Sequence, residues 1–349
     1  MIILFCYQFN SSQVIHSFKI TITITNQSIT MMWIVIGLLL CIITIMFSTI
    51  VLPIIIITEI VIMTAALAAV YQERKIWLHP KLPSLTPTGM IKVFGLNVVW
   101  MSVCLFGAVI ATIEAVVTNN WLDLQHTRKI AHEIVERKCG MLVTLLFVGP
   151  VVINGIENLP ALEPGKPAPV YIANHASQID VAVVYYLERR WRWIAKSSTM
   201  FLPGVGQIMY LGDHVLIDRI PKKKKSSDDA SSRKTSSTGA RNLYKKSDQS
   251  IQDGVPMFFF PQGTRRLGER LPFKDGAYKV AKNNDSTLIP VSIHIPLNAW
   301  NSSYPFGKAD PVVLTVHKPI VTKDKDIETL KKESSDIIYS VLPDYTKQE

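Results

Sequence analysis

A histidine and an aspartate are the first side chains in this sequence that could do chemistry together. His175 and Asp180 lie five residues apart in the stretch 170–180, VYIANHASQID. In a continuous α-helix that spacing turns the two side chains about 140° away from each other. They can meet only if His175 precedes a helix and Asp180 lies in its first turn. Asp180 would then accept a hydrogen bond from one imidazole nitrogen and leave the other nitrogen as a base.

The same pattern also allows structural roles for both residues. Ser177 and Asp180 fit a capping box, in which the carboxylate serves the free amides at a helix start. His175 could be a turn residue with a structural hydrogen bond. Taken alone, this spacing favours structure over catalysis.

A second stretch, 258–266 (FFFPQGTRR), again places polar residues directly after an apolar run. Gly263 would allow a close backbone approach, and Thr264 offers a hydroxyl group. Arg265 offers a planar fork of donors that suits phosphate. A tight turn with solvent-facing arginines fits the same residues. The stretch is not a P-loop, because the Gly-x4-Gly-Lys spacing is missing.

The elements around both stretches follow from the hydrophobic pattern. Short apolar runs predict seven strands, at 147–153, 169–173, 192–196, 214–218, 256–260, 287–295 and 311–317. Helical patterns lie between several of them, at about 178–190, 238–252, 275–283 and 325–342. Strands alternating with helices predict an α/β domain, a mixed sheet flanked by helices. His175 then lies at the carboxyl end of a strand, where such sheets build sites.

Taken together, four ordered motifs resemble the PlsC-like glycerolipid acyltransferases, the family typified by lysophosphatidic acid acyltransferase. The family motif N-H-x4-D is matched at 174–180, and F-P-E-G-T-R is matched at 260–265 except for Gln262. The other two motifs resemble 212–219 and 289–291. The resemblance covers about residues 150–295.

The resemblance implies that His175 is the catalytic base and that Asp180 supports it. It also implies that a turn after a strand holds the phosphate of the acceptor. The residues expected to bind substrate are Asn174, Lys196, Arg219, Gln262, Gly263, Thr264, Arg265 and Pro290. No covalent acyl-enzyme, metal or prosthetic group is expected, and acyl-CoA would be a co-substrate.

Gln262 is a departure from the family pattern, which has glutamate there. Glutamine keeps the shape and can hydrogen-bond, but the negative charge is lost. If the glutamate normally orients Arg265 through an ion pair, that orientation is weaker here. We expect activity to persist, because His175 and Asp180 are intact.

Charge divides the chain of 349 residues unevenly. Residues 1–125 carry 5 Lys/Arg and 4 Asp/Glu, whereas 126–349 carry the other 32 and 23. The first third is too apolar for a soluble domain, and the remainder has ordinary globular composition. This excludes a disordered chain and a collagen-like fibre. It also excludes a small disulfide scaffold, since none of the four cysteines lies after Cys139 and the polar part therefore has no disulfide framework.

The apolar third predicts membrane segments. After an N-terminal apolar and polar segment at 1–30, residues 31–71 fit one or two transmembrane helices. Pro53 would kink or break a single helix, so two spans are preferred. Residues 91–119 fit a transmembrane or re-entrant helix. The acyltransferase domain is expected to occupy 126–349.

A basic, Ser-rich insertion interrupts that domain at 221–237, and we expect it to be disordered. It could contact anionic lipid, or it could simply be solvated in a surface loop. Nucleic acid is not expected as a partner, because aromatic residues are not interleaved with these charges.

The sequence therefore predicts a membrane-bound enzyme that moves an acyl chain from acyl-CoA to the sn-2 hydroxyl of 1-acylglycerol 3-phosphate. Its partners would be lysophosphatidic acid, acyl-CoA and the bilayer. Another acceptor, such as glycerol 3-phosphate or another lysophospholipid, is the nearer alternative, and a non-catalytic lipid-binding scaffold is the farther one. The endoplasmic reticulum, with the domain facing the cytosol, is the expected location, and a plastid membrane is the alternative. An acyl-carrier-protein donor and the oligomeric state stay open.

Overall fold

The computed structural model describes residues 31–78, 82–117, 124–217 and 230–344. The chain divides into two compact units, with the boundary between Ile60 and Val61. The candidate site residues, which lie between Gln72 and Pro290, all belong to the second unit. The expected domain start at 126 does not separate two units, because the core of the second unit includes residues as early as Trp77.

The N-terminal apolar segment forms one continuous helix, Met31–Ile76. Its last part is α2, Leu52–Ile76, which follows a π-helical segment, Phe47–Val51. The helix is therefore not broken at Pro53, and the number of times it crosses a membrane stays a prediction. The wider π turn directly before Pro53 leaves room for the ring where an ordinary helical turn would clash. By length and composition alone, this helix could cross a membrane.

The second long apolar helix is α3, Pro87–Val117, and it too could span a membrane by length and composition. It packs against α5 (Arg137–Phe147) and α7 (Val205–Leu211). One face is buried in the core of the unit through residues such as Leu96, while Phe106 lies exposed. Residues 91–117 of the expected segment 91–119 thus belong to a helix that also packs in the core of the second unit.

In the described part of the chain, seven strands form one mixed sheet, in the order β1-β7-β6-β2-β5-β3-β4. All pairs are parallel except β6 with β7. The strands are β1 Val151–Asn154, β2 Val170–Ala173, β3 Arg192–Lys196, β4 Val215–Ile217, β5 Met257–Phe259, β6 Leu288–His294 and β7 Val312–Val316. All except β1 lie within their predicted runs, and β1 ends at Asn154, one residue beyond the run 147–153. β1 begins later than predicted, because α5 continues to Phe147.

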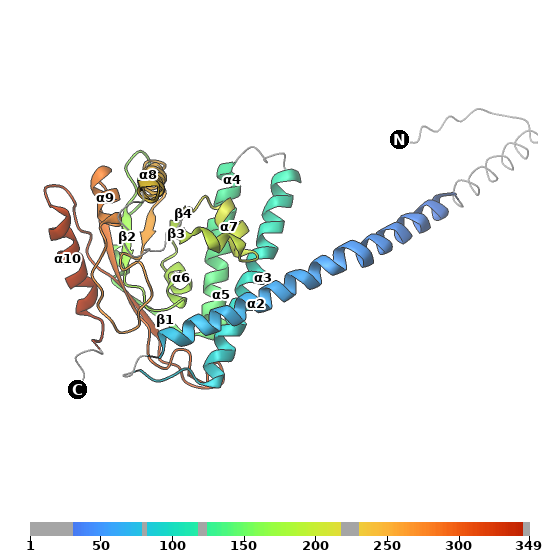
Figure 1. The fold of residues 1–349 in the computed structure, drawn as a ribbon, viewed down its shortest axis with the longest axis horizontal. Helices are drawn as coiled ribbons and strands as arrows, with labels where there is room; N and C mark the ends of the chain where they lie inside the picture. The colour runs from blue at the N-terminus through green and yellow to red at the C-terminus, as the bar shows by residue number, and fades with distance from the viewer. Residues whose placement is uncertain (1–30, 79–81, 118–123, 218–229, 345–349) are drawn as a thin grey trace, which may run out of the picture. The chain divides into compact units, whose positions relative to one another are not determined.

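Helices cover both faces of the sheet, as Figure 1 shows. Alternate residues of β2 point to opposite sides, so Tyr171 packs in one core and Ile172 in the other. The first core includes α3, α5 and α6 (Ile179–Val183). The second includes α9 (Gly276–Asn283) and α10 (Ile327–Ser340), with the end of α8 (Ala230–Gln252). The predicted α/β class, a mixed sheet flanked by helices, is confirmed.

Pro290 lies in β6, between β7 and β2, and not on an edge strand. The three steps from Leu288 to Val291 are matched by four steps from Val316 to Ile320 on the other side. This extra residue is a bulge, one of the two arrangements that a proline in a strand predicts. The carbonyl of Pro290 still accepts from the backbone of His317 at 2.9 Å.

The basic insertion differs from expectation at its end. Helix α8 begins at Ala230, so residues 230–237 are helical and not disordered. Extending an existing helix by one residue costs far less than starting a new one, so the predicted helix at 238–252 can propagate backwards. The first part of the insertion lies outside the described residues.

Candidate active site

The carboxyl ends of three neighbouring parallel strands meet at the site. His175 follows β2, Lys196 ends β3, and the turn at 261–265 follows β5. Because these strands are adjacent and parallel, residues after their carboxyl ends lie at one edge of the sheet. The fold thus brings together motifs that are almost ninety residues apart.

His175 and Asp180 are in contact, in the arrangement that their five-residue spacing requires. Helix α6 begins at Ile179, so His175 precedes the helix and Asp180 lies in its first turn. The imidazole Nδ1 lies 2.7 Å from Asp180 Oδ2. The Asp180 carboxylate is fully buried, while the His175 side chain is 16% exposed. Among the described residues no partner occupies Nε2, so this nitrogen is available as a base.

Asp180 fills both roles that the sequence left open. The oxygen that contacts His175 also accepts from the backbone N–H groups of Ala176, at 2.6 Å, and of Ser177, at 3.1 Å. Charge-assisted bonds from two amides hold the carboxylate in place. Helix capping and orientation of the imidazole are therefore one arrangement.

The turn after β5 holds the backbone of His175 on both sides. Gln262 Oε1 accepts from the His175 N–H at 2.5 Å, and the Arg266 N–H donates to the His175 carbonyl at 2.9 Å. The imidazole also stacks on Phe260, with ring centroids 4.0 Å apart. These contacts fix the position of the imidazole more firmly than a turn alone would.

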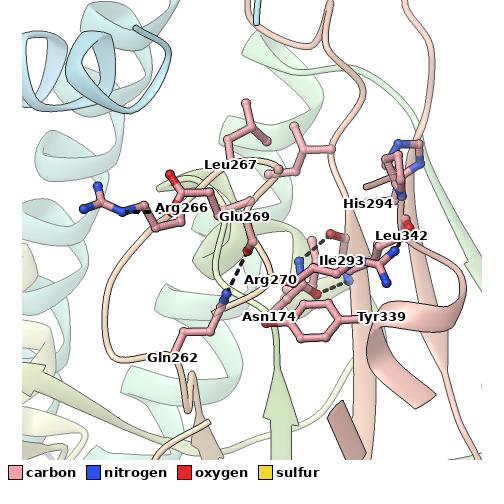
Figure 2. Close-up of a pocket in the computed structure, with 14 residues that line it drawn as sticks. Asn174, Gln262, Arg266, Leu267, Glu269, Arg270, Ile293, His294, Tyr339 and Leu342 are labelled. Atoms are coloured by element: carbon pink, nitrogen blue, oxygen red, sulfur yellow. Dashed lines mark hydrogen bonds and ion pairs between the residues drawn. The ribbon is translucent and has the colours of Figure 1, made fainter. Parts of the chain in front are cut away.

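Gln262 makes its second contact behind this turn. Figure 2 shows its amide nitrogen pointing to the carbonyl of Glu269, at 3.4 Å, in a small cavity that Asn174 also lines. The amide donates on one side and accepts on the other. A carboxylate could take only the accepting role, so glutamine suits both contacts.

Arg265 is held by the end of α2, which the sequence did not suggest. Its guanidinium donates to Glu73 Oε2 at 3.1 Å and to Gln72 Oε1 at 3.3 Å. The Glu73 carboxylate is fully buried, and Arg265 is 24% exposed. The positive charge expected to hold an acceptor phosphate thus already has an anionic neighbour.

The other expected substrate-binding residues divide into two groups. Lys196 and Thr264 line a cavity of about 450 Å³ together with His175, Gly263 and Arg265. Asn174 and Pro290 are buried in the fold instead. The Asn174 amide bridges to β6 by accepting from the Ile293 N–H at 2.8 Å and donating to its carbonyl at 2.9 Å. Arg219 lies outside the described residues.

A second cavity at His175 is apolar. It measures about 260 Å³ and runs among α3, α7 and the end of β3, with polar groups only at a few positions. Its lining includes Trp100, Val181, Ile208, Met209 and Phe260. His175 therefore lies where an apolar space meets a space lined by cationic side chains.

One group of side chains beside the apolar cavity has the composition of a metal site. His132, Glu136 and His214 place their ligand atoms within 4.8 Å of one another, and all three are buried. The Trp193 N–H donates to His214 Nδ1 at 2.8 Å, so the ring proton lies on Nε2 and points to Glu136. A protonated Nε2 has no lone pair for a metal. The hydrogen bonds favour a structural cluster.

Three contacts of the site were not predicted from the sequence. They are those of Gln72 and Glu73 with Arg265 and the stacking of Phe260 on His175. Phe260 could have been found, because it precedes the turn in the motif. Gln72 and Glu73 lie more than a hundred residues before His175 at the end of an apolar helix. No spacing signal connects residues over that distance.

The class of this domain follows from the comparison with protein families. The model of the Acyltransferase family matches residues 150–294. That region contains His175 and Asp180, the turn after β5 and Pro290. Residues 150–294 are therefore an acyltransferase-family domain, which confirms the resemblance read from the four motifs.

The chain is also similar to individual proteins that share one name. The chain is 31% identical to a 1-acyl-sn-glycerol-3-phosphate acyltransferase of Chlamydomonas reinhardtii over 222 residues. The aligned region is 62% of this chain and 60% of that protein. It is 26% identical to a chloroplastic enzyme of the same name from Arabidopsis thaliana, over 58% of this chain and 52% of that one. It is 28% identical to the human beta enzyme, over 46% and 53%. The chain thus spans between half and two thirds of the length of these relatives.

Among solved structures, the chain is similar to the 1-acyl-sn-glycerophosphate acyltransferase PlsC from Thermotoga maritima. The sequence identity is 22% and the TM-score is 0.45, over 69% of this chain and 93% of that chain.

Proposed function

We propose that this protein is a membrane-bound acyltransferase that moves an acyl chain from acyl-CoA to the sn-2 hydroxyl of 1-acyl-sn-glycerol 3-phosphate, giving phosphatidic acid. The observation that carries the proposal is the position of His175. Its imidazole lies between an apolar cavity and a cavity lined by Lys196 and Arg265. An acyl chain and a phosphate are the substrate parts that suit those two spaces.

The chemistry is a transfer from sulfur to oxygen. His175 Nε2 takes the proton of the acceptor hydroxyl as the oxygen attacks the thioester carbonyl. The new C–O bond forms, the C–S bond breaks, and the imidazolium returns the proton to the leaving thiolate. Asp180 Oδ2, 2.7 Å from Nδ1, holds the tautomer and stabilises the imidazolium. No covalent enzyme intermediate is needed.

The choice of a phosphate-bearing acceptor rests on two supports. Lys196 is exposed at the cavity and has no ion pair among the described residues, so its charge is available to an anion. The relatives above are all named as 1-acyl-sn-glycerol-3-phosphate acyltransferases. A second acceptor, such as glycerol 3-phosphate or lysophosphatidylcholine, also carries a phosphate and is the nearest alternative.

The donor and the location belong to the same proposal. A helix long and apolar enough to span a bilayer would keep the site near lipids that partition to the interface. Acyl-CoA is cytosolic, so the domain would face the cytosol, at the endoplasmic reticulum. Two relatives are named as chloroplastic, which favours a plastid membrane as the alternative. Protease protection of 221–229 in sealed vesicles would decide the side.

An activity panel tests the function. Purified membranes containing the full chain are given labelled oleoyl-CoA with lysophosphatidic acid, glycerol 3-phosphate or lysophosphatidylcholine. We expect label in phosphatidic acid, and we expect His175→Ala to remove it. A variant as active as the wild type would contradict the mechanism. Acylation of lysophosphatidylcholine alone would contradict the acceptor.

A further inference from the structure

Glu73 is a fully buried acidic side chain near the site, and the domain match at 150–294 does not include it. It lies in the last turns of α2 with no exposed surface. Its Oε1 accepts from the Ser177 hydroxyl and, at 3.3 Å, from the indole N–H of Trp300. Its Oε2 accepts from Arg265 at 3.1 Å. A buried carboxylate is costly unless it is paired in this way.

The charge on Arg265 is not balanced from within its own turn. Gln262, three residues before it, is neutral, and Glu269 contacts Arg266 at 3.6 Å. The anionic partner of Arg265 comes instead from α2, 192 residues away in the sequence. Gln72, beside it, accepts from the other guanidinium nitrogen at 3.3 Å. Two consecutive residues of α2 thus fix both ends of the arginine fork.

The same carboxylate also reaches the loop that carries the base. The Ser177 hydroxyl donates to Glu73, and the Ser177 backbone N–H donates to Asp180 at 3.1 Å. A short chain of contacts therefore links Glu73, Ser177, Asp180 and His175. Because Glu73 touches both motifs, it can set the distance between the arginine and the imidazole.

We infer that Glu73 is a positioning residue for acceptor binding, which acts by holding Arg265 in the orientation that receives the acceptor phosphate. The inference rests on the proposed function. It makes α2 a part of the active site in addition to a possible anchor. The opposite role would be inhibitory: if Glu73 blocked Arg265, the acceptor phosphate would have to displace the Glu73 carboxylate. The two roles predict opposite changes in the KM for the acceptor.

Glu73→Gln is the informative substitution because it keeps the volume. The Oε1 of glutamine can still accept from Ser177 and Trp300, so those contacts can persist. Its amide N–H₂ would face the Arg265 donors and could not accept from them. We expect the KM for lysophosphatidic acid to rise about tenfold, the usual effect of losing one hydrogen bond between charged groups. The KM for oleoyl-CoA should stay within about twofold.

A double-mutant cycle shows whether the effect passes through Arg265. The full-length chain is assayed in membranes as wild type, Glu73→Gln, Arg265→Ala and the double variant. If Glu73 acts through Arg265, the substitution at 73 adds nothing once the arginine is gone. Glu59→Gln is the matched control, since it makes the same change on the same helix at an exposed position.

A second variant separates an effect on Arg265 from a folding defect. Gln72→Ala removes the other contact to Arg265 from an exposed position, so it should leave the melting temperature unchanged and raise the acceptor KM by a smaller factor. An unchanged or lower acceptor KM in Glu73→Gln, equal rises for donor and acceptor, or multiplied effects in the double variant would overturn the inference. An inactive wild type would overturn the proposed function as well.

Discussion

At the scale of single residues, the site depends on a carboxylate that does two things with one oxygen. Asp180 Oδ2 accepts from His175 Nδ1 and from two backbone amides of its own helix start. Capping of the helix and orientation of the imidazole are therefore compatible, because the same oxygen makes all three contacts. The amides hold the carboxylate, and the carboxylate in turn holds the ring.

Asp180→Asn should remove this orientation while keeping the size of the side chain. An amide nitrogen in place of Oδ2 would face two donating amides, and an amide oxygen there would be neutral toward the imidazolium. We expect kcat to fall by about 10³- to 10⁴-fold, measured by label transfer to lysophosphatidic acid. Asp310→Asn, at an exposed position, is the control and should keep wild-type activity. A fall of less than tenfold would mean that His175 needs no carboxylate.

At the scale of elements, the turn after β5 is the part whose backbone conformation matters most. Gly263 has a φ of +71°, and its N–H donates to the Phe260 carbonyl at 2.9 Å. A side chain there would also meet Lys274, which lies across the turn. This geometry sets where Thr264 and Arg265 leave the strand.

Gly263→Ala should therefore weaken activity as well as stability. Gly165 offers a matched control, because it has a φ of +80° with no neighbouring atom within 4 Å of an added Cβ. Both substitutions should cost about 1–2 kcal/mol of folding free energy for the left-handed backbone. Only Gly263→Ala should also reduce kcat/KM, by about tenfold or more, since the turn carries Arg265. Thermal melts and initial rates measure the two effects; equal activity losses would contradict this assignment.

At the scale of the whole molecule, a buried cluster ties the helix 130–136 to the sheet. Glu136 accepts from His214 and from the Tyr185 hydroxyl, and it contacts His132 at 3.1 Å. Burial by itself would raise the pKa of the Glu136 carboxyl. The attraction of His214 and His132, with their hydrogen bonds, more than offsets burial and holds this pKa well below its ordinary value.

This shift predicts the direction of acid sensitivity. A carboxyl whose pKa is lower in the folded protein stabilises the fold above its unfolded pKa of about 4.3, and that stability is lost as the pH falls below it. Glu136→Gln should lower the melting temperature at pH 7 and make the remaining stability less dependent on pH below about 4.5. Glu163→Gln, an exposed pair with Lys166, should change neither. Parallel pH curves for Glu136→Gln and the wild type would contradict this account.

Local sequence patterns were enough to predict the strands, several of the helices and the pairing of His175 with Asp180. Those features depend on local patterns: an apolar run of strand length, a Gly-containing turn, and a five-residue spacing that only a helix start can close. The α/β class followed from the alternation of these elements. The family resemblance followed from four motifs in one order, and the match at 150–294 agrees with it.

The groups that surround His175 and Asp180 could be identified only from the packing of distant segments. The continuous helix through Pro53 and the central place of Pro290 both depend on irregular backbone, a π turn and a bulge, which leave no mark in hydrophobic periodicity. The partner of Arg265 depends on packing between segments 192 residues apart. Local patterns encode local geometry, whereas the carboxylate at Glu73 meets Arg265 only because the whole sheet and its helices bring the end of α2 to the site.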